Sequence, residues 1–284
     1  MSQATDLYCV MGNPVAHSRS PAIHARFAEL TGEVLAYERR LVALDGFAEG
    51  VRDFAAQGGR GCNVTVPFKT EAPALATHCS ERVQLAGAAN TLAFRPDGSI
   101  HCDNTDGLGL VADITRNAGV ALQGASVLLV GAGGAAAGVL GPLLQAGACQ
   151  VTIANRTVAK AEALVQSHQA LAAHLGAQLA ASSLDGVAGA FDVVVNATAS
   201  SLAGDAVPVA ASVLRPGGLA YDMMYGPAAQ GFLDWAAAHG AVPRDGLGML
   251  VEQAAEAFAF WRGVRPPSAQ VLAELQAQLA LQAH

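Results

Sequence analysis

The glycine-rich run that begins at Gly131 has the clearest chemical meaning in the sequence. Gly131, Gly133 and Ala136 follow the spacing G-x-G-x-x-A. In that pattern the first glycine makes a tight turn, the second lets a pyrophosphate approach backbone amides, and the small third residue lets helix and strand pack closely. The pattern is weak alone, but an apolar run at 126–130 precedes it and a small-residue helix is expected up to 145. The run therefore predicts a dinucleotide site.

The residues after the next expected strand indicate which dinucleotide. An enzyme that prefers NAD usually places Asp or Glu about 20 residues after the glycines, where it holds the ribose 2′-hydroxyl. This chain has Asn155, Arg156 and Thr157 there, and no acid. A guanidinium can bind a 2′-phosphate, and Lys160 would share the helix face of Arg156, although it is equally well read as a solvated helix residue. The pattern favours NADP.

The composition excludes several classes of protein. With 284 residues, 52% hydrophobic and 14% charged, the chain has the length of about two domains and is too apolar for disorder. The net charge is −7 without a run of like charges, which argues against nucleic-acid and anionic-membrane partners. Every apolar stretch ends before the length of about 18 residues that a spanning helix needs, and residues 1–6 carry no secretion signal.

Cysteine and histidine positions predict neither a disulfide framework nor a metal site. The five cysteines are odd in number and include no C-x-x-C pair, so a reducing cytoplasm is expected. Cys62 and Cys102 are expected to pack in the core. The eight histidines are scattered, and His17 and His24 lack acidic neighbours at ligand spacing.

Hydrophobic periodicity predicts two α/β regions. In the first hundred residues, strands are expected at 7–11, 34–41 and 60–65, helices at 21–30, 47–57 and near 69–77, and a hairpin with strands 90–95 and 99–101. In the second region, strands at 126–130, 150–154, 192–196 and 218–221 alternate with helices, which is typical of a doubly wound sheet. A loop is expected at 243–246, followed by helices at 249–261 and 268–281 whose attachment periodicity does not settle.

Eight sequence blocks stand in order along the chain. They are GNPVAHSRSPAIH (12–24), NVTVPFK (63–69), GAANTL (87–92), DNTDG (103–107), GAGGAAAG (131–138), NRT (155–157), YDMMYG (221–226) and DGLGMLVEQAAEAFAFWRG (245–263). Together they resemble the shikimate dehydrogenase family, and the resemblance spans essentially the whole chain.

The resemblance implies an oxidoreductase that interconverts 3-dehydroshikimate and shikimate with NADP, a step toward chorismate and the aromatic amino acids. It implies an α/β substrate-binding domain of residues 1–106 and 248–284, to which the C-terminal helices return, and a Rossmann-type NADP-binding domain of residues 107–247. The substrate cleft then lies between the domains. A cytoplasmic monomer or homodimer without nucleic-acid or membrane partners is expected.

The same resemblance assigns roles to individual residues. It implies that Lys69 and Asp106 are the catalytic pair. The implied substrate-binding positions are Ser18, Ser20, Thr65, Asn90, Asp106 and Gln253. Ser18 and Ser20 would hold the carboxylate, although Ser20 is equally well read as the N-cap of the helix that begins at Pro21. The implied cofactor-binding positions are Gly131, Ala132, Gly133, Gly134, Ala135, Asn155, Arg156, Thr157, Lys160, Thr198, Met223, Tyr225 and Gly246.

The chemistry expected of Lys69 is charge or proton supply at a ketone oxygen. Hydride reduction of a ketone needs one or the other at the oxygen, and an ammonium can give either. A carboxylate beside Lys69 favours the charged lysine, which stabilises an alkoxide but makes the lysine a reluctant proton donor. Asp106 either tunes the lysine or binds a substrate hydroxyl, so both roles stay open.

Two departures from the family pattern lie in the cofactor domain. Similar enzymes usually have Gly where Ser201 stands, and a Thr-Pro-Phe run at 230–232 where this chain has Gln230 and Gly231 before Phe232. Two alternatives also remain. A quinate or broad shikimate/quinate dehydrogenase using NAD is opposed by Arg156, and a catalytically silent NADP-binding sensor is opposed by the presence of Lys69 and Asp106.

Overall fold

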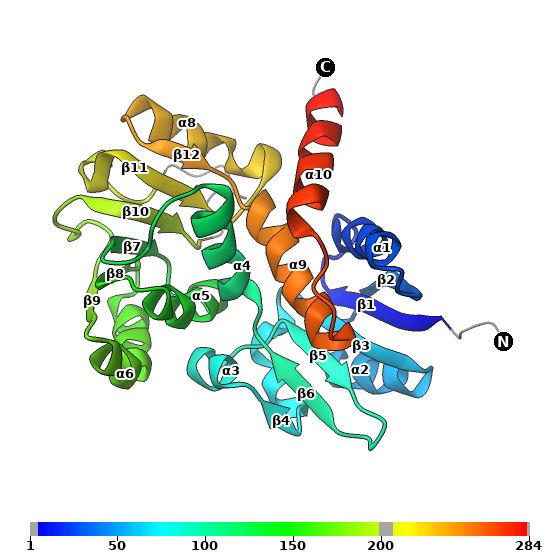
Figure 1. Cartoon of the computed structure of the whole chain (residues 1–284). Helices are drawn as coiled ribbons and strands as arrows, with labels where there is room; N and C mark the ends of the chain where they lie inside the picture. Colours follow the sequence, from blue (N-terminus) through cyan, green and yellow to red (C-terminus); the bar gives the residue numbers. More distant parts are fainter. Residues whose placement is uncertain (1–4, 199–206, 283–284) are drawn as a thin grey trace. The chain divides into compact units, whose positions relative to one another are not determined.

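Two six-stranded sheets organise the chain in the computed structural model, which describes residues 5–198 and 207–282 (Figure 1). The chain divides into two compact units, one of Met1–Gly109 with Val251–His284 and the other of Leu110–Leu250. Each unit combines one sheet with helices. The predicted α/β class is therefore confirmed.

The sheet of the first unit is mixed, with the strand order β2-β1-β3-β5-β6-β4. Its strands are β1 (Asp6–Gly12), β2 (Leu35–Leu41), β3 (Gly59–Val64), β4 (His78–Cys79), β5 (Thr91–Phe94) and β6 (Ile100–Asp103). β1 pairs in parallel with β2 and β3, whereas β5 runs antiparallel to β3 and β6, and β4 pairs in parallel with β6. The parallel strands β1 and β3 therefore end at the same edge of the sheet, at Gly12 and Val64.

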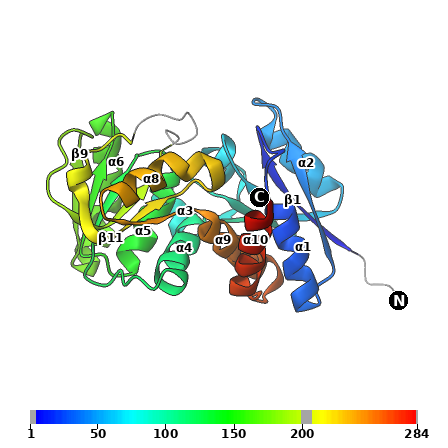
Figure 2. The same ribbon diagram turned by 90° about the horizontal axis from the view of Figure 1, so that it is seen from above.

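Helices from both ends of the sequence complete the first unit. They are α1 (Ser20–Thr31), α2 (Phe47–Ala56), α3 (Glu81–Ala86), most of α9 (Leu247–Arg262) and α10 (Ser268–Gln282). The C-terminal helix α10 lies beside α1 in both views (Figures 1 and 2). Arg26 of α1 donates from Nε and Nη2 to the two carboxylate oxygens of Glu274 of α10, at 2.8 and 2.9 Å.

The sheet of the second unit is parallel throughout and has the order β12-β11-β10-β7-β8-β9. Its strands are β7 (Ser126–Val130), β8 (Gln150–Ala154), β9 (Gln178–Ser182), β10 (Phe191–Asn196), β11 (Leu214–Asp222) and β12 (Val242–Arg244). Numbered within the unit, the order is 6-5-4-1-2-3, which is that of a dinucleotide-binding Rossmann sheet. The strand order reverses between β7 and β10, where such sheets bind their ligands.

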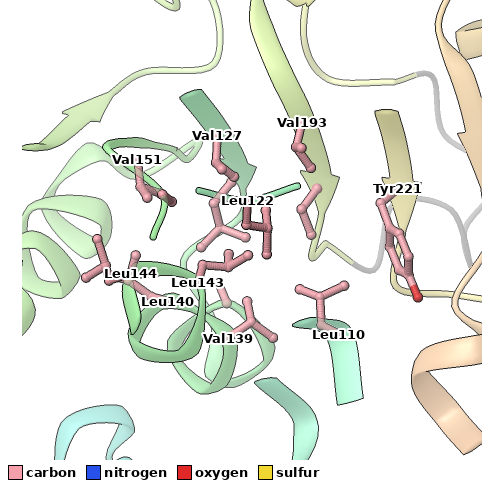
Figure 3. Packing of buried hydrophobic residues seen from close by; sticks show 14 of the residues in the cluster. Leu110, Leu122, Val127, Val139, Leu140, Leu143, Leu144, Val151, Val193 and Tyr221 are labelled. Atoms are coloured by element: carbon pink, nitrogen blue, oxygen red, sulfur yellow. The ribbon is translucent and has the colours of Figure 1, made fainter. Parts of the chain in front are cut away.

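Apolar side chains of α5 (Gly134–Gln145) fill one face of the second sheet. Figure 3 shows Val139, Leu140, Leu143 and Leu144 of this helix facing Val127 and the neighbouring strands. The helices α6 (Val158–Leu175) and α8 (Gln230–Ala238) also pack on this sheet. Strands buried on both faces explain why 127–130 and 193–195 are uninterrupted runs of valine and leucine.

Three expectations from the sequence are wrong in detail. The helix expected near 69–77 is instead two short 3₁₀ turns, η1 (Phe68–Thr70) and η2 (Ala72–Leu75), because Pro73 lacks the N–H of a continuous helix and its ring clashes with the preceding turn. The loop expected at 243–246 includes the end of β12. Ser20 is the first residue of α1 rather than its N-cap, which is Arg19.

A buried carboxylate organises the second unit near the start of α9. Asp113 begins a π-helical turn, Asp113–Asn117, directly after α4 (Asp106–Ala112). It is fully buried and accepts two hydrogen bonds from Arg244, at 2.6 and 2.8 Å, and one from the Tyr221 hydroxyl at 2.7 Å. A Cβ added to Gly248 of α9 would stand 1.8 Å from Asp113 Oδ1. The hydrogen bonds to Asp113 raise the pKa of Arg244.

Within the described residues, no helix is both long and apolar enough to cross a membrane.

We predict that Arg244→Met destabilises the protein by about 3–5 kcal/mol, because it leaves the Asp113 carboxylate buried without its cation. The free energy of unfolding in urea measures the loss. The double variant Asp113→Asn with Arg244→Met, which buries no charge, should recover part of it, and equal losses in the two proteins would contradict the prediction.

Candidate active site

Lys69 and Asp106 form a close ion pair in the first unit. Lys69 lies on η1, directly after β3, and Asp106 is the first residue of α4. Lys69 Nζ donates to Asp106 Oδ2 at 2.6 Å, with side-chain exposures of 21% for the lysine and 7% for the aspartate. Phe68 fixes the turn that carries Lys69, because its buried ring stacks on Phe47 with centroids 4.8 Å apart. The arrangement holds an ammonium group at a partly buried position.

Asn90 orients the carboxylate of that pair. Its Nδ2 donates to Asp106 Oδ1 at 2.8 Å, and its Oδ1 accepts from the backbone N–H of Thr105 at 2.8 Å. Asn90 Nδ2 also lies 3.3 Å from Gln253 Oε1 on α9. The structure therefore joins four residues that the sequence proposed for the site, Lys69, Asn90, Asp106 and Gln253, by direct hydrogen bonds.

A second layer of buried polar groups supports Asn90. Thr91 Oγ1 donates to Asn90 Oδ1 at 2.9 Å, Asn63 Nδ2 donates to Thr91 Oγ1 at 3.0 Å, and the Tyr37 hydroxyl donates to Asn63 Oδ1 at 2.7 Å. Asn63 and Thr91 are register partners on β3 and β5. Buried polar groups need such partners. Sequence reasoning missed these three residues, although polar side chains inside the apolar strands at 63 and 91 were a usable signal.

Ser18 and Ser20 lie where the chain passes from β1 to α1. The Ser18 carbonyl accepts from Arg39 Nε at 2.9 Å and Nη2 at 2.6 Å, and the Ser18 hydroxyl oxygen lies 3.3 Å from the backbone nitrogen of Ser20. Ser20 is buried and interacts with Tyr37, whose pKa is raised by burial. Ser20 is thus linked through Tyr37 to the polar network around Asn90.

Thr65 completes the set of residues proposed for the substrate. It directly follows β3, and its backbone N–H donates to the carbonyl of Met11 at 2.9 Å. Thr65 therefore lies at the edge of the sheet where the parallel strands β1 and β3 end. Thr65 and Lys69 lie on the same connection after β3, four positions apart in the sequence.

His24 lies on the apolar side of this region. It is fully buried on α1, and its ring stacks on Tyr37 with centroids 4.3 Å apart. Phe258 and Trp261 of α9 lie beside it, with ring centroids 6.1 and 5.4 Å away. Burial lowers the pKa of His24 from its ordinary value of 6.5 to about 3, although the nearby Asn63 side chain opposes the shift.

The glycine loop of the second unit has the geometry of a phosphate cradle. Gly131 follows β7 with a φ of +111°, and a Cβ there would meet Ala197 O and Thr198 Cγ2 at 3.1 Å. Gly133 is the N-cap of α5, and a Cβ on it would meet nothing within 4 Å among the described residues. Among the residues that the structure describes, no side chain caps α5. A helix N-terminus is positively polarised and carries unpaired backbone N–H groups, which suits a pyrophosphate.

Arg156 and Lys160 lie beyond the end of β8. Both are exposed, and within the described part of the chain neither side chain forms a hydrogen bond or an ion pair. Asn155 Nδ2 donates to the carbonyl of Thr157 at 2.9 Å, which shapes the turn into α6. Two cations without a protein counter-charge, at the place where a dinucleotide presents its 2′ group, fit a phosphate there.

The remaining predicted cofactor positions lie at the carboxyl ends of β10, β11 and β12. Thr198 Oγ1 donates to Asn196 Oδ1 at 2.7 Å, and the backbone N–H of Met223 donates to the carbonyl of Asn196 at 3.0 Å. Gly246 N donates to the carbonyl of Met224 at 2.8 Å, next to Tyr225. The second unit thus gathers its predicted cofactor residues at one edge of a parallel sheet, and they fit a dinucleotide.

Comparison with known proteins identifies the family of the chain. A model of the shikimate dehydrogenase substrate binding domain matches residues 10–92, one of shikimate / quinate 5-dehydrogenase matches 113–204, and one of the shikimate 5′-dehydrogenase C-terminal domain matches 246–276. The chain is 76% identical over 276 residues to a shikimate dehydrogenase (NADP(+)) of Verminephrobacter eiseniae (strain EF01-2), which covers 97% of this chain and 96% of that one. The chain belongs to the shikimate dehydrogenase family.

Solved structures of similar proteins extend the likeness to the fold. An Ael1 enzyme from Pseudomonas putida is 46% identical with a TM-score of 0.87, covering 95% of this chain and 98% of its own. A shikimate 5-dehydrogenase from Thermus thermophilus, solved in complex with NADP(H) and shikimate, is 31% identical with a TM-score of 0.81, covering 94% and 97%. The predicted family is therefore confirmed.

One of the two departures from the family pattern can be placed. Gln230 and Gly231 begin α8, where Gln230 Nε2 donates to Asp234 Oδ1 at 2.7 Å and Phe232 is buried against Trp235. The helix forms without a proline in its first turn. Ser201 lies outside the described residues.

We predict an acid-sensitive contribution of His24 to stability. Below pH 6.5 the unfolded chain binds a proton at this ring, whereas the folded chain does so only near pH 3, so stability falls as the pH falls. Between pH 7 and pH 5 the loss from this one group is about 2 kcal/mol. Unfolding free energies of the wild type and His24→Leu at both pH values test it. An equal pH dependence in the two proteins would contradict the prediction.

Proposed function

We propose that this chain catalyses the NADP-dependent interconversion of shikimate and 3-dehydroshikimate, and that Lys69 and Asp106 assist the hydride transfer. The observation that carries the proposal is the hydrogen-bonded set of Lys69, Asp106, Asn90 and Gln253 within a chain of this family. Its relatives with 71–76% identity are named shikimate dehydrogenase (NADP(+)). We therefore assign this chain the function of an oxidoreductase that uses NADP.

The two units are proposed to divide the work. Residues 1–106 and 248–284 bind the substrate, and residues 107–247 bind NADP. The backbone amides of Gly131 to Ala135 hold the pyrophosphate, and the cations of Arg156 and Lys160 hold the 2′-phosphate. Asn155, Thr157, Thr198, Met223, Tyr225 and Gly246 complete the cofactor groove. When bound, NADP supplies the hydride donor or acceptor of the reaction.

Lys69 acts at the oxygen that changes between ketone and alcohol. In reduction, its Nζ stabilises the developing alkoxide and holds the proton that the oxygen needs. Asp106 accepts a hydrogen bond from that same Nζ, so it fixes the position of the ammonium group. Because Asn90 fixes the second carboxylate oxygen, Asp106 is held in one orientation.

The other polar groups are proposed to hold the ring of the substrate. Ser18 and Ser20 bind its carboxylate, and Thr65, Asn90 and Gln253 contact its hydroxyl groups, together with Asp106.

The four free thiols of the first unit and the exposed Cys149 of the second suit a reducing compartment, and we place the enzyme in the cytoplasm. A monomer or a homodimer is the oligomeric state that we propose.

The direct test mixes the protein with shikimate and NADP and follows the absorbance of the reduced nicotinamide. We expect turnover with this pair. Parallel assays with quinate, and with NAD in place of NADP, separate the proposal from a shikimate/quinate dehydrogenase that uses NAD. Binding of NADP without turnover on either substrate would instead identify a silent sensor.

We predict that Arg156→Ala weakens NADP binding by about 1.5–3 kcal/mol, or about 10- to 150-fold in Kd, because a charge-assisted contact to the 2′-phosphate is lost. Binding of NAD, which lacks that phosphate, should change little. Lys160→Ala, in the first turn of α6, is the comparison variant, with a smaller expected effect; Arg156 itself lies just before this helix and not on it, contrary to the expectation of a shared helix face. Equal weakening of both dinucleotides in Arg156→Ala would overturn the assignment.

We predict that Lys69→Ala lowers kcat by about 10²–10⁴-fold with a smaller effect on KM, because its interaction is strongest in the transition state. Asp106→Ala should be non-additive with it, since either change disables the same pair. Single-turnover hydride transfer at saturating substrate measures the chemical step. If the pair only holds substrate, KM rises and the transfer rate of Lys69→Ala stays at the wild-type value.

A further inference from the structure

Two pairs of cysteines face each other across parallel strands of the first unit. Cys79 of β4 and Cys102 of β6 are register partners, as are Cys9 of β1 and Cys62 of β3. All four are free thiols. Their pairing is not visible in the sequence, where 23 positions separate Cys79 from Cys102. It arises because β4 adds to the edge of the sheet beside β6.

The geometry of Cys79 and Cys102 is close to that of a disulfide. Their Sγ atoms are 3.0 Å apart. Neighbouring strands are separated by about 4.8 Å, which lies within the range of about 4.4–6.8 Å between Cα atoms that a disulfide bridges. A bond between the sulfurs, at about 2 Å, needs them to approach by only about 1 Å. The backbone thus already holds the two thiols in reach of each other.

Neighbouring polar contacts keep this approach fixed. Ser80, which follows Cys79, donates from Oγ to Asp103 Oδ1 at 2.6 Å, and Asp103 follows Cys102. Arg82 Nη2 donates to the other oxygen of the same carboxylate at 2.6 Å. The two segments are therefore joined one residue beyond each cysteine. Groups held together in this way react much faster than free ones.

The two sulfurs differ in access. Cys79 is half-buried, whereas Cys102 is buried with 2% of its surface exposed. Burial, with the neighbouring Cys79, raises the pKa of the Cys102 thiol. An oxidant from solvent therefore reaches Cys79 first, and Cys102 stands behind it as the second thiol. Cys9 and Cys62 share the strand pairing but are both fully buried, so no oxidant reaches them.

We propose that Cys79 and Cys102 form a modification site, at which hydrogen peroxide closes a reversible intramolecular disulfide. Cys79 Sγ attacks one peroxide oxygen and the O–O bond breaks. The products are a sulfenic acid on Cys79 and the first molecule of water. Cys102 Sγ then attacks Cys79 Sγ, the S–O bond breaks, and the second water leaves with the Cys102 proton. Two thiols and one peroxide give one disulfide and two waters, and two electrons pass from sulfur to the peroxide. Disulfides of this transient kind are the ones found in reducing compartments.

The test uses the full-length Cys149→Ser protein, because the exposed Cys149 would otherwise react with peroxide by itself. We expect dilute hydrogen peroxide to lower the count of free thiols from four to two, without a dimer on a non-reducing gel. Tryptic peptides 70–82 and 83–116 carry Cys79 and Cys102 respectively, so their linked product, lighter by two hydrogen atoms, identifies the bond. Dithiothreitol should restore all four thiols.

Two controls make the result specific. In Cys79→Ser with Cys149→Ser, three thiols are present and all three should survive the same treatment. Peptides 1–19 and 61–69, which carry Cys9 and Cys62, should stay unlinked in every sample. The proposal is overturned if four thiols persist, if Cys79 stops at the sulfenic acid without linkage to Cys102, or if the linked pair is Cys9 with Cys62.

Discussion

The Asp106 carboxylate, nearly buried at the start of α4, is the group on which the candidate site depends. A buried charge is costly unless it is paired and hydrogen-bonded. Lys69 supplies the opposite charge to Oδ2, and Asn90 supplies a donor to Oδ1. Each partner requires its own support, so Phe68 anchors the turn of Lys69, and Thr91 and Asn63 extend the polar network behind Asn90. The strand pairing of β3 with β5 thus serves the chemistry as well as the sheet.

Both units use the same feature of parallel strands, each within its own sheet. Thr65 follows the carboxyl end of β3, and Ser18 and Ser20 lie in the connection after β1. In the second unit, Gly131, Arg156, Thr198 and Met223 follow the carboxyl ends of β7, β8, β10 and β11. Because parallel strands all end at the same edge of their sheet, residues that follow them are close in space although they are far apart in the sequence. This explains why short blocks after strands carry most of the sequence signal for function.

Much of this structure follows from local sequence patterns. The apolar run at 126–130, the buried strand expected at 192–196 and the glycines after the first of them predict a parallel sheet with a phosphate loop, because such strands are buried on both faces. The family blocks add Lys69, Asp106, Asn90 and Gln253, which the structure joins. Several short or weakly apolar elements were not predicted, namely α3, α4, β4, β9, α8 and β12. Their positions depend on tertiary pairing, as β4 shows by occupying two residues beside β6.

Hydrophobic periodicity also does not predict contacts between polar residues that are far apart in the sequence. Nothing in the spacing of Asp113, Tyr221 and Arg244 indicates that they meet, since 131 positions separate the first from the last. The same holds for Tyr37 and Asn63, which are 26 positions apart. Such contacts are fixed by the fold as a whole, and only a buried acid or amide in an apolar segment hints that a partner must exist.

The close approach of Gly248 to Asp113 limits how this protein can be engineered. Glycines within helices are routine targets for thermal stabilisation, because alanine restricts the unfolded chain and is the better helix former. At position 248 the methyl group would overlap a carboxylate that Arg244 and Tyr221 hold in place. A design protocol that ranks sites by helix propensity would therefore propose alanine at a position that cannot accept its methyl group. Only glycine, whose side chain is a single hydrogen atom, leaves room for the Asp113 carboxylate at this position.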